Sequence, residues 1–306
     1  MRAVVNTPGG ASPIELRDVP EPEPGPGEVL VEVKAVSLNR GELTSFKNNP
    51  EGWRPGQDVA GVVASVRDAA SGVAAGSRVV ALLDEAGWAE RVAVPLHRLA
   101  VLPDAVAFEQ AAALPVAGIT ALRTVRYGEP LLGRKVLVNG AAGGVGSLAV
   151  QLATTAGARV TAVARAEHSD AVRALGAVEV VDSPEAARGP FRLILESVGG
   201  AALKAAFGRV EANGTIVVFG NSSRQPTEFA FNDFFAAQNA RVQTFFSFSS
   251  GPEEAFAADL ALLAGLVADG ALQPQIGSVR SWRDIAQAAA DLAGRRLMGK
   301  AVFRID

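Results

Sequence analysis

Closely spaced glycines form the sharpest chemical signal in the sequence, Gly140-Ala-Ala-Gly143-Gly144-Val-Gly146. The run follows the apolar stretch 135–139 and precedes a helical pattern over 147–156. Glycines let a backbone approach a pyrophosphate closely, and a helix N-terminus adds N–H groups and the positive end of a dipole. The spacing is not the usual G-x-G-x-x-G, so a plain tight turn is the alternative. The strand before and the helix after favour a dinucleotide-binding turn.

The residues after the next predicted strand, 159–163, indicate which dinucleotide fits. In NAD-preferring sites a carboxylate roughly 20 residues beyond the turn binds the ribose 2′-hydroxyl. Here that position holds Ala164, followed by Arg165, whose guanidinium suits a 2′-phosphate, and His168 could assist. Arg165 could instead be a solvated loop charge. Glu167 is a nearby carboxylate, although glutamate is also common in the first turn of a helix. The sequence predicts NADPH rather than NADH.

The secondary structure predicted for the segments that would position this turn changes along the chain. In the first hundred residues, β-branched stretches mix apolar and polar positions as half-buried strands do; they cover 29–36, 59–66, 78–83 and 89–94. From residue 105 onward helical patterns alternate with short apolar strands. The predicted helices cover 108–127 (interrupted at Pro115), 147–156, 169–175, 201–210 and 282–293, and the strands cover 135–139, 160–164, 179–181, 193–195, 215–219 and 300–305. This alternation predicts an α/β fold with a doubly wound parallel sheet beside a β-rich region.

The composition excludes several classes of function. The 306 residues suffice for roughly two domains, and a net charge of −3 gives no basic excess for nucleic acid or an anionic membrane. Cysteine is absent and only two histidines occur, so disulfides, thiolate zinc sites and a cysteine nucleophile are excluded. No apolar run approaches the ~18 residues of a membrane span, and the N-terminus lacks an apolar signal core. We therefore expect a cytoplasmic protein without membrane or nucleic-acid partners.

Six stretches, taken together, resemble the medium-chain dehydrogenase/reductase superfamily, and within it the zinc-independent, quinone-oxidoreductase-like branch. The resemblance covers essentially the whole chain, and the order and combination of the stretches make it specific. The stretches are Glu28–Arg40, Arg54–Val63, Gly87–Pro95, Ala111–Ala121, Val136–Ala153 and Glu196–Gly200.

The resemblance implies two domains and a cofactor. It implies a GroES-like catalytic domain over residues 1–110 and 271–306, and a Rossmann domain over residues 111–270, with the cofactor in the cleft between them. It also implies hydride transfer between NADPH and a quinone or a carbonyl-conjugated double bond. Beside the glycines, Arg165 and His168, it extends the cofactor contacts to Thr120, Val145, Val198, Phe219 and Gly220.

The chain departs from the zinc-binding members of the superfamily at their metal ligands. Asn39 stands in place of a cysteine ligand, Gln57 in place of a histidine ligand, and Gly41 in place of a proton-relay hydroxyl. Amides are poor zinc ligands beside thiolate and imidazole, so the resemblance implies a site that works without metal. Without a Lewis acid, a quinone or enone accepts a hydride more easily than a simple ketone, because the charge spreads to an oxygen that hydrogen-bond donors can stabilise.

Three side chains are candidates for that stabilisation. Asn39 and Gln57 carry amide donors, and Arg40 carries a positive charge. Each has a structural alternative: Asn39 could brace a loop, Gln57 could be a structural polar residue, and Arg40 could be a solvated charge. Nothing in the sequence aims Asp58 or Glu42 at a substrate, so we expect water to deliver the proton.

Aromatic residues are the candidates for the substrate pocket. Trp53 follows a loop expected near the substrate, where it could stack on a planar ring or fill the loop core. Phe246, with Phe245 and Phe248, falls in a predicted edge strand, 241–248. These side chains could face the substrate, or they could pack in the core and pair at the sheet edge. Because a long apolar edge strand invites aggregation unless covered, we expect a homodimer through it.

Two other functions fit the same stretches. The acceptor could be an enoyl thioester, although its carrier arm would need a long groove with basic residues at the mouth. The protein could also bind NADPH without turnover and act through a partner, because fold does not guarantee function. The intact glycine turn favours an enzyme with a small-molecule quinone or enone substrate.

Overall fold

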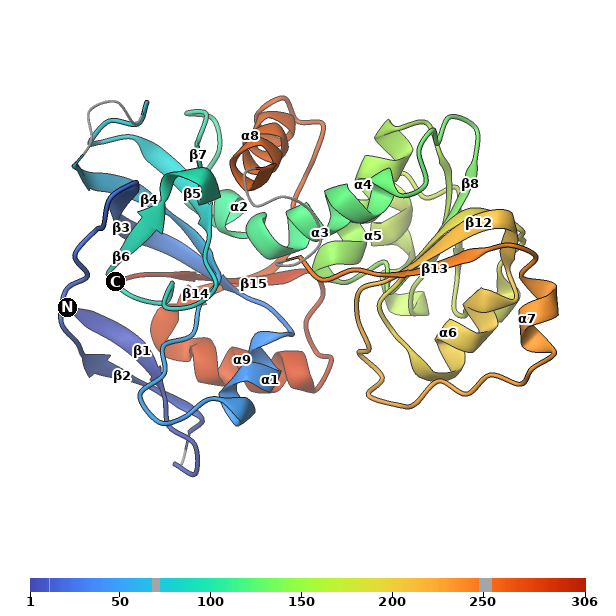
Figure 1. Ribbon diagram of the computed structural model, residues 1–306, viewed down its shortest axis with the longest axis horizontal. Coiled ribbons are helices and arrows are strands. Elements are labelled where there is room, and N and C mark those ends of the chain that lie inside the picture. Colours follow the sequence, from blue (N-terminus) through green and yellow to red (C-terminus); the bar gives the residue numbers. More distant parts are fainter. Residues whose placement is uncertain (11, 68–71, 248–254) are drawn as a thin grey trace. The chain divides into compact units, whose positions relative to one another are not determined.

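The computed structural model describes residues 1–10, 12–67, 72–247 and 255–306. Its internal contacts group the chain into two compact units (Figure 1). The first unit contains Met1–Ile119 and Gly251–Asp306, and the second unit contains Thr120–Ser250. Strands prevail in the first unit, whereas strands alternate with helices in the second.

A mixed sheet of seven strands is the framework of the first unit. The strands follow the order β14-β15-β3-β4-β5-β7, and β6 also pairs with β3. Only β14 and β15 pair in parallel; the other pairs are antiparallel. The strands are β3 (Glu28–Leu38), β4 (Asp58–Val66), β5 (Arg78–Leu82), β6 (Arg91–Pro95), β7 (Leu99–Val101), β14 (Ile276–Ser281) and β15 (Lys300–Arg304). Two further strands, β1 (Arg2–Asn6) and β2 (Ile14–Asp18), form a separate antiparallel pair.

The long strand β3 leads into the candidate site. Its alternation of residues predicts one buried face, and Val29, Val31 and Val33 are buried whereas Glu32 between them is exposed. Three strands, β4, β6 and β15, pair with it. At its end Leu38 lies opposite the second residue of β15, so the segment after β3 begins beside the start of β15.

Among the described residues, four α-helices lie wholly within the first unit. They are α1 (Glu42–Asn48), α2 (Phe108–Ala112), α8 (Ala255–Ala268) and α9 (Ile285–Ala293). Trp88, Trp282 and Phe303 are among the largest fully buried side chains. Helix α8 contacts β5 and β7, which places it in the first unit although it lies in the range expected for the Rossmann domain. No helix among the described residues is both long and apolar enough to cross a membrane.

A parallel sheet of six strands forms the second unit, in the order β10-β9-β8-β11-β12-β13. The strands are β8 (Lys135–Asn139), β9 (Arg159–Val163), β10 (Glu179–Val181), β11 (Phe191–Glu196), β12 (Val210–Val218) and β13 (Arg241–Thr244). The order reverses between β8 and β11. Because such crossovers are right-handed, α4 (Gly144–Thr155) and α5 (Ser169–Ala174) cover one face, and α6 (Gly200–Phe207) and α7 (Asp233–Ala236) lie on the other (Figure 1). Helix α3 (Pro115–Arg126) precedes β8. The predicted doubly wound sheet is confirmed.

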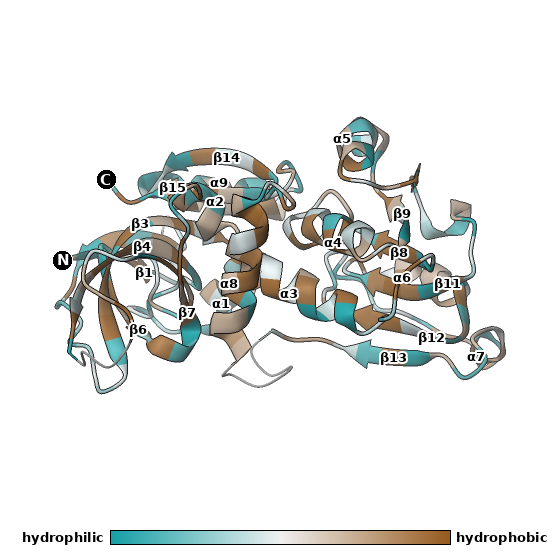
Figure 2. Cartoon of the chain, turned by 90° about the horizontal axis from the view of Figure 1, so that it is seen from above, coloured by the Kyte–Doolittle hydropathy of each residue, from teal (hydrophilic) through white to brown (hydrophobic). Residues whose placement is uncertain are grey.

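Hydropathy separates the centre of this sheet from its edge (Figure 2). The central strands are apolar, whereas β13 at the edge is mostly polar, with all four residues exposed. The predicted edge strand over 241–248 is therefore too long and too apolar. The strand ends at Thr244. The next residue, Phe245, is buried and packs edge-on against Tyr127, with ring centroids 6.5 Å apart. Phe248 lies outside the described residues.

Candidate functional site

The glycine turn of the second unit joins the end of β8 to the start of α4. Gly140 has a φ of +83°, and the N–H of Gly143 donates to its carbonyl oxygen at 3.0 Å, which closes the turn. A Cβ on Gly146 would lie 2.2 Å from the same carbonyl oxygen, so α4 can pack on the turn only with glycine there. Helix α4 begins at Gly144, and the first N–H groups of a helix have no acceptor within it. The turn thus presents the N–H groups and positive helix end that suit a pyrophosphate.

The other predicted cofactor residues follow the ends of neighbouring strands. Arg165 follows β9, Val198 follows β11, and Phe219 and Gly220 follow β12. In the order β9-β8-β11-β12 these strands are adjacent and parallel. Their carboxyl ends therefore gather at one edge of the sheet, where ligands bind in folds of this type. The topology brings these residues to the glycine turn, and their contacts with a cofactor stay a prediction.

Arg165 lies in a small group of polar side chains after β9. Its guanidinium Nη1 lies 3.0 Å from a Glu167 carboxylate oxygen, and its Nη2 lies 3.3 Å from Nε2 of His168. The side chain is 61% exposed, and so is that of Glu167. Arg165 and His168 are therefore together, as the NADPH prediction requires. Glu167 is a competing partner for the same guanidinium.

A buried carboxylate braces the turn after β11. Glu196 is fully buried, and its two oxygens accept hydrogen bonds from Asn139 Nδ2 at 2.6 Å and from the N–H groups of Val198 at 2.5 Å and Gly199 at 2.9 Å. Burial raises the pKa of this carboxyl. The Ser197 hydroxyl donates to the Asn139 carbonyl oxygen at 2.9 Å. Sequence reasoning missed this clamp, whose only signal is a carboxylate at the end of an apolar strand.

Thr120 and Phe246, which the sequence also predicts as site residues, lie in the second unit. Thr120 is buried in α3, where its carbonyl oxygen accepts a hydrogen bond from the Thr124 hydroxyl at 2.7 Å. Phe246 follows β13 and is 64% exposed, whereas Phe245 beside it is buried. The exposure of Phe246 does not fit core packing, and both pairing at the sheet edge and a role toward substrate stay predictions.

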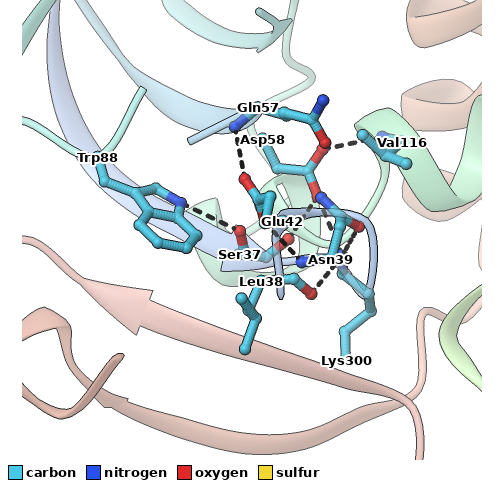
Figure 3. Close-up of polar contacts among 9 residues, drawn as sticks. All are labelled: Ser37, Leu38, Asn39, Glu42, Gln57, Asp58, Trp88, Val116 and Lys300. Atoms are coloured by element: carbon cyan, nitrogen blue, oxygen red, sulfur yellow. Dashed lines mark hydrogen bonds and ion pairs between the residues drawn. The ribbon is translucent and has the colours of Figure 1, made fainter. Parts of the chain in front are cut away.

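Asp58 is the centre of a buried network in the first unit (Figure 3). Its Oδ2 accepts hydrogen bonds from the Ser37 hydroxyl at 2.6 Å, the Asn39 amide at 2.8 Å and the Lys300 ammonium at 3.0 Å. Its Oδ1 accepts one from the backbone N–H of Val116 at 2.9 Å. Asp58 is the first residue of β4, so the network ties the end of β3 to the start of its neighbour. A carboxylate with this many donors is well compensated for its burial.

Lys300 supplies the positive charge of this network. It is 5% exposed and is the first residue of β15. Its Nζ donates to Asn39 Oδ1 at 2.5 Å and to the Leu38 carbonyl oxygen at 3.1 Å, besides Asp58. An ammonium has three donors, and here each has an acceptor. Sequence reasoning missed Lys300, because it lies 242 positions from Asp58 along the chain.

Glu42 joins the same region from the start of α1. It is 2% exposed, and its carboxyl oxygens accept hydrogen bonds from the backbone N–H groups of Asn39 at 2.7 Å and Gln57 at 3.1 Å. It thus links the loop after β3 to the loop before β4. Burial and the nearby charge of Asp58 raise the pKa of Glu42 to about 8. The carboxyl is therefore mostly protonated at neutral pH.

The network distinguishes the three predicted catalytic residues. The Asn39 amide is held by Asp58 and Lys300 and is 8% exposed, so it does brace its loop. The Gln57 side chain is half-buried and forms no hydrogen bond with any described residue. Arg40 donates to the Leu292 carbonyl oxygen in α9 at 3.3 Å and is half-buried, so it is not merely a solvated charge.

Trp53 sits in a loop of the first unit. It is half-buried against the core, and its indole N–H donates to the Glu85 carboxylate. Its backbone carbonyl oxygen accepts a hydrogen bond from the Asn6 N–H at 2.7 Å. The loop-packing role is thus supported, and stacking on a substrate stays a prediction.

Within the described ranges there is no cluster of three or more His, Cys, Asp or Glu side chains that could hold a metal ion.

Two known protein families match the chain. The "Alcohol dehydrogenase GroES-like domain" matches residues 25–104, and the "Zinc-binding dehydrogenase" family matches residues 144–265. The first match lies within the first unit, and the second begins at the glycine turn.

Individual proteins are similar over part or all of the chain. The chloroplast envelope quinone oxidoreductase homolog of Arabidopsis thaliana is 40% identical over 197 residues, 58% of this chain and 60% of that protein. The chain thus spans less than two thirds of that relative. The trans-enoyl reductase tazE of Aspergillus terreus is 35% identical over 208 residues, 59% of this chain and 67% of that protein. A mycobacterial structure complexed with NADPH superposes over the whole of both chains with a TM-score of 0.90 at 26% identity.

Proposed function

The chain belongs to the medium-chain dehydrogenase/reductase superfamily of oxidoreductases, and we propose that it transfers a hydride from NADPH to a quinone or an α,β-unsaturated carbonyl compound without a metal ion. The GroES-like match, the glycine turn and the doubly wound sheet support the family. The quinone oxidoreductase homolog among its relatives supports the acceptor class.

NADPH is the cofactor that suits the second unit. The glycine turn and the start of α4 offer backbone N–H groups for the pyrophosphate. Arg165 and His168 lie together after β9, where a 2′-phosphate would need positive charge. A structural relative solved with NADPH supports the same choice.

The single observation that carries the acceptor class is the pair of carboxamides, Asn39 and Gln57, with the Gln57 amide unbonded within the described chain. A hydride that adds to a conjugated carbon pushes an electron pair onto the carbonyl oxygen. An amide N–H can stabilise that oxygen by hydrogen bonding. A localised alkoxide from a simple ketone would need a stronger electrophile. The amides therefore favour a quinone or enone.

Water supplies the proton that completes the reduction. NADPH supplies the hydride when bound, so one acceptor molecule takes up a hydride and a proton while NADPH becomes NADP⁺. The raised pKa of Glu42 favours its protonated form at neutral pH, but its oxygens face the backbone N–H groups of Asn39 and Gln57. It is engaged in holding the loops rather than aimed at a substrate.

An enoyl thioester is the second candidate acceptor. The trans-enoyl reductase relatives favour it, and the chemistry of hydride addition to a conjugated double bond is the same. A thioester acceptor on coenzyme A adds phosphates and a long arm. Turnover of enoyl-CoA is therefore the discriminating observation.

One panel of acceptors tests these functions. Purified protein with NADPH is mixed in turn with benzoquinones, 9,10-phenanthrenequinone, simple enones and enoyl-CoA, and NADPH oxidation is followed by absorbance. Quinones or enones should be the best acceptors by kcat/KM. A clear preference for enoyl-CoA would replace the proposal with the second candidate. NADPH binding without oxidation by any acceptor would instead indicate a non-catalytic protein.

Metal analysis tests the metal-free part of the proposal. Cysteine is absent and amides occupy the positions of Asn39 and Gln57, so we expect no stoichiometric zinc in the purified protein. Treatment with a chelator should leave the rate of NADPH oxidation unchanged. One bound zinc per chain, or a rate that falls with chelation and returns with zinc, would overturn this part.

We also propose that the protein works in the cytoplasm as a homodimer. The open edge of β13, with exposed backbone and side chains, supports the dimer. The lack of cysteine is consistent with a compartment in which disulfides do not form.

A further inference from the structure

The side-chain amide of Asn39 can take only one orientation in its network (Figure 3). Its Oδ1 lies 2.5 Å from the Lys300 ammonium, which can only donate. Its Nδ2 lies 2.8 Å from the Asp58 carboxylate, which accepts. Exchanging oxygen and nitrogen would place the NH₂ group against the ammonium, donor to donor, and the amide oxygen against the Asp58 carboxylate, acceptor to acceptor. The charges of Lys300 and Asp58 therefore fix the amide.

This arrangement leaves one N–H of the Asn39 amide without an acceptor among the described residues. An amide nitrogen carries two hydrogens, and Nδ2 makes a single hydrogen bond within the described chain, to Asp58. The ammonium on Oδ1 withdraws electron density from the amide, and hydrogen bonds in a chain polarise one another. The remaining N–H is thereby a stronger donor than that of an isolated amide.

Lys300 is held more firmly than charge balance alone requires. Its contact with Asp58 balances the negative charge of that carboxylate. The ammonium also binds Leu38 and Asn39, the residues at which β3 ends and the loop begins. The pairing of Ala301 with Leu38 sets Lys300 at this place. Strand β15 thus delivers the ammonium to the amide oxygen rather than merely to the carboxylate.

We propose that Lys300 is a positioning residue for the hydride-transfer reaction: it orients and polarises the Asn39 amide so that its second N–H donates to the substrate oxygen on which negative charge develops. This inference rests on the proposed function. The Asn39 amide then both braces its loop and donates to the substrate. Both roles depend on Lys300, from the last strand.

Lys300→Met is the first test, with Lys34→Met as its matched control. Lys34 lies on β3 and forms an exposed ion pair with Glu32, which contributes little to stability. In Lys300→Met, kcat per NADPH-binding site should fall about ten- to hundredfold, the loss expected for a misplaced oxyanion donor. The dissociation constant for NADPH should stay within about twofold of wild type, since the glycine turn lies in the other unit. Lys34→Met should match wild type in both.

A kinetic isotope effect separates positioning from simple loss of folded protein. With NADPH deuterated at the transferred position, Lys300→Met should show a larger isotope effect on kcat than wild type, because hydride transfer becomes more fully rate-limiting. A purely structural role would lower the number of NADPH sites and leave kcat per site and its isotope effect unchanged. That result would overturn the proposal.

Chemical rescue covers the case in which Lys300→Met does not fold. Because the chain has no cysteine, Lys300→Cys introduces a single thiol. Alkylation with 2-bromoethylamine in denaturant, followed by refolding, restores an ammonium at nearly the length of lysine; iodoacetamide gives a neutral amide on the same backbone. The first product should recover most of the wild-type kcat per NADPH site and the second should not. Equal activity of the two products would contradict the proposal.

Hydrogen exchange tests whether Lys300 holds the Asn39 loop without requiring that the protein turn over a substrate. If wild-type protein oxidises no NADPH with any acceptor, the proposed function fails. The amides of residues 39–43 should still exchange at least about tenfold faster in Lys300→Met than in Lys34→Met, because their anchor is lost. Unchanged exchange there would show that Lys300 does not hold the Asn39 loop, whatever the reaction.

Discussion

A protonated Glu42 makes stability depend on pH in a defined direction. Its pKa is about 8 in the folded protein, because of burial and the nearby Asp58, against an ordinary value of 4.5. Between these values the folded chain holds a proton that the unfolded chain has released. The free energy of unfolding should therefore fall as pH rises through this window, by about 1.4 kcal/mol per pH unit from this group. Chemical denaturation across the window measures this slope.

Glu42→Gln should remove this contribution to the slope. The amide does not titrate, although its NH₂ group would meet one backbone N–H of Asn39 or Gln57 and lower stability at every pH. The slope, and not the absolute stability, is thus the quantity to compare. Glu51→Gln is the control, since Glu51 is 67% exposed. A Glu42→Gln variant with the wild-type slope would show that Glu42 is ionised in the folded protein.

Arg165 should set the preference for NADPH. An Arg–phosphate hydrogen bond contributes about 1.5–3 kcal/mol, so Arg165→Ala should weaken NADPH binding about ten- to hundredfold and NADH binding far less. The lower end of this range is expected, because Arg165 must leave Glu167 to bind a phosphate. Titration of both cofactors by fluorescence measures the two affinities.

A surface arginine far from the strand ends is the control for Arg165. Arg188 is 90% exposed and precedes β11, so it lies away from the carboxyl ends of the strands. Arg188→Ala should leave both affinities unchanged. Equal losses for NADPH and NADH in Arg165→Ala would mean that this guanidinium does not read the 2′-phosphate.

The site residues were predictable only where a local pattern marks them. The glycine turn lies between β8 and α4, and Arg165 follows the next strand, β9, so a short, continuous stretch of sequence predicts both. Lys300 and Glu196 act through contacts with segments far along the chain. A single charged residue at the end of an apolar strand can be exposed to solvent or buried against a partner. The neighbouring sequence does not distinguish these two cases. For Asn39, the sequence could not decide between bracing and donation because both use the same amide.

At the scale of elements, packing of α4 on the glycine turn should depend on Gly146. A Cβ there would lie 2.2 Å from the Gly140 carbonyl oxygen, and 2.8 Å from Ala141 Cα. Gly146→Ala should lower the free energy of unfolding by about 1–3 kcal/mol, as overpacking does, and weaken NADPH binding by displacing the turn. Thermal denaturation and cofactor titration measure the two effects.

Gly143→Ala is the matched control in the same turn. Gly143 has a φ of −78°, which any residue adopts, and a Cβ there would meet only the Gly140 carbonyl oxygen, at 3.3 Å. The free energy of unfolding of the Gly143→Ala variant should stay close to that of wild type. If Gly146→Ala is as stable as Gly143→Ala, the close approach of α4 to the turn is not a constraint on the fold.

Most elements of the second unit were predictable because strand and helix patterns alternate there without ambiguity. Because glycines disfavour helices by propensity, the sequence predicts a helix from Ser147, whereas α4 begins three residues earlier, at Gly144. The contacts of α4 with β8 and β9 override that preference at Gly144 and Gly146. The strand after β12 is shorter than predicted. Its β-branched and aromatic residues favour a strand over 241–248, but β13 ends at Thr244 and the next residue, Phe245, is buried.

For the whole molecule, the open edge of β13 is the surface through which we expect two chains to pair. The described strand is short, with Val242 as its one apolar residue, and every side chain in it is exposed. Phe246 just beyond it is also exposed. Pairing of two β13 strands about a twofold axis would satisfy the outward backbone groups and cover both side chains.

Light scattering at micromolar concentration should then give twice the chain mass of 31.5 kDa. The N–H of Phe245 donates to Val218 in β12, so by alternation along the strand the N–H of Thr244 points to the open side. Thr244→Pro removes that outward donor and spares the pairing with β12, as proline on an edge strand can. It should shift the protein to monomers while NADPH still binds. A wild-type monomer would refute the dimer, whereas an unchanged dimer in Thr244→Pro would refute only its location on β13.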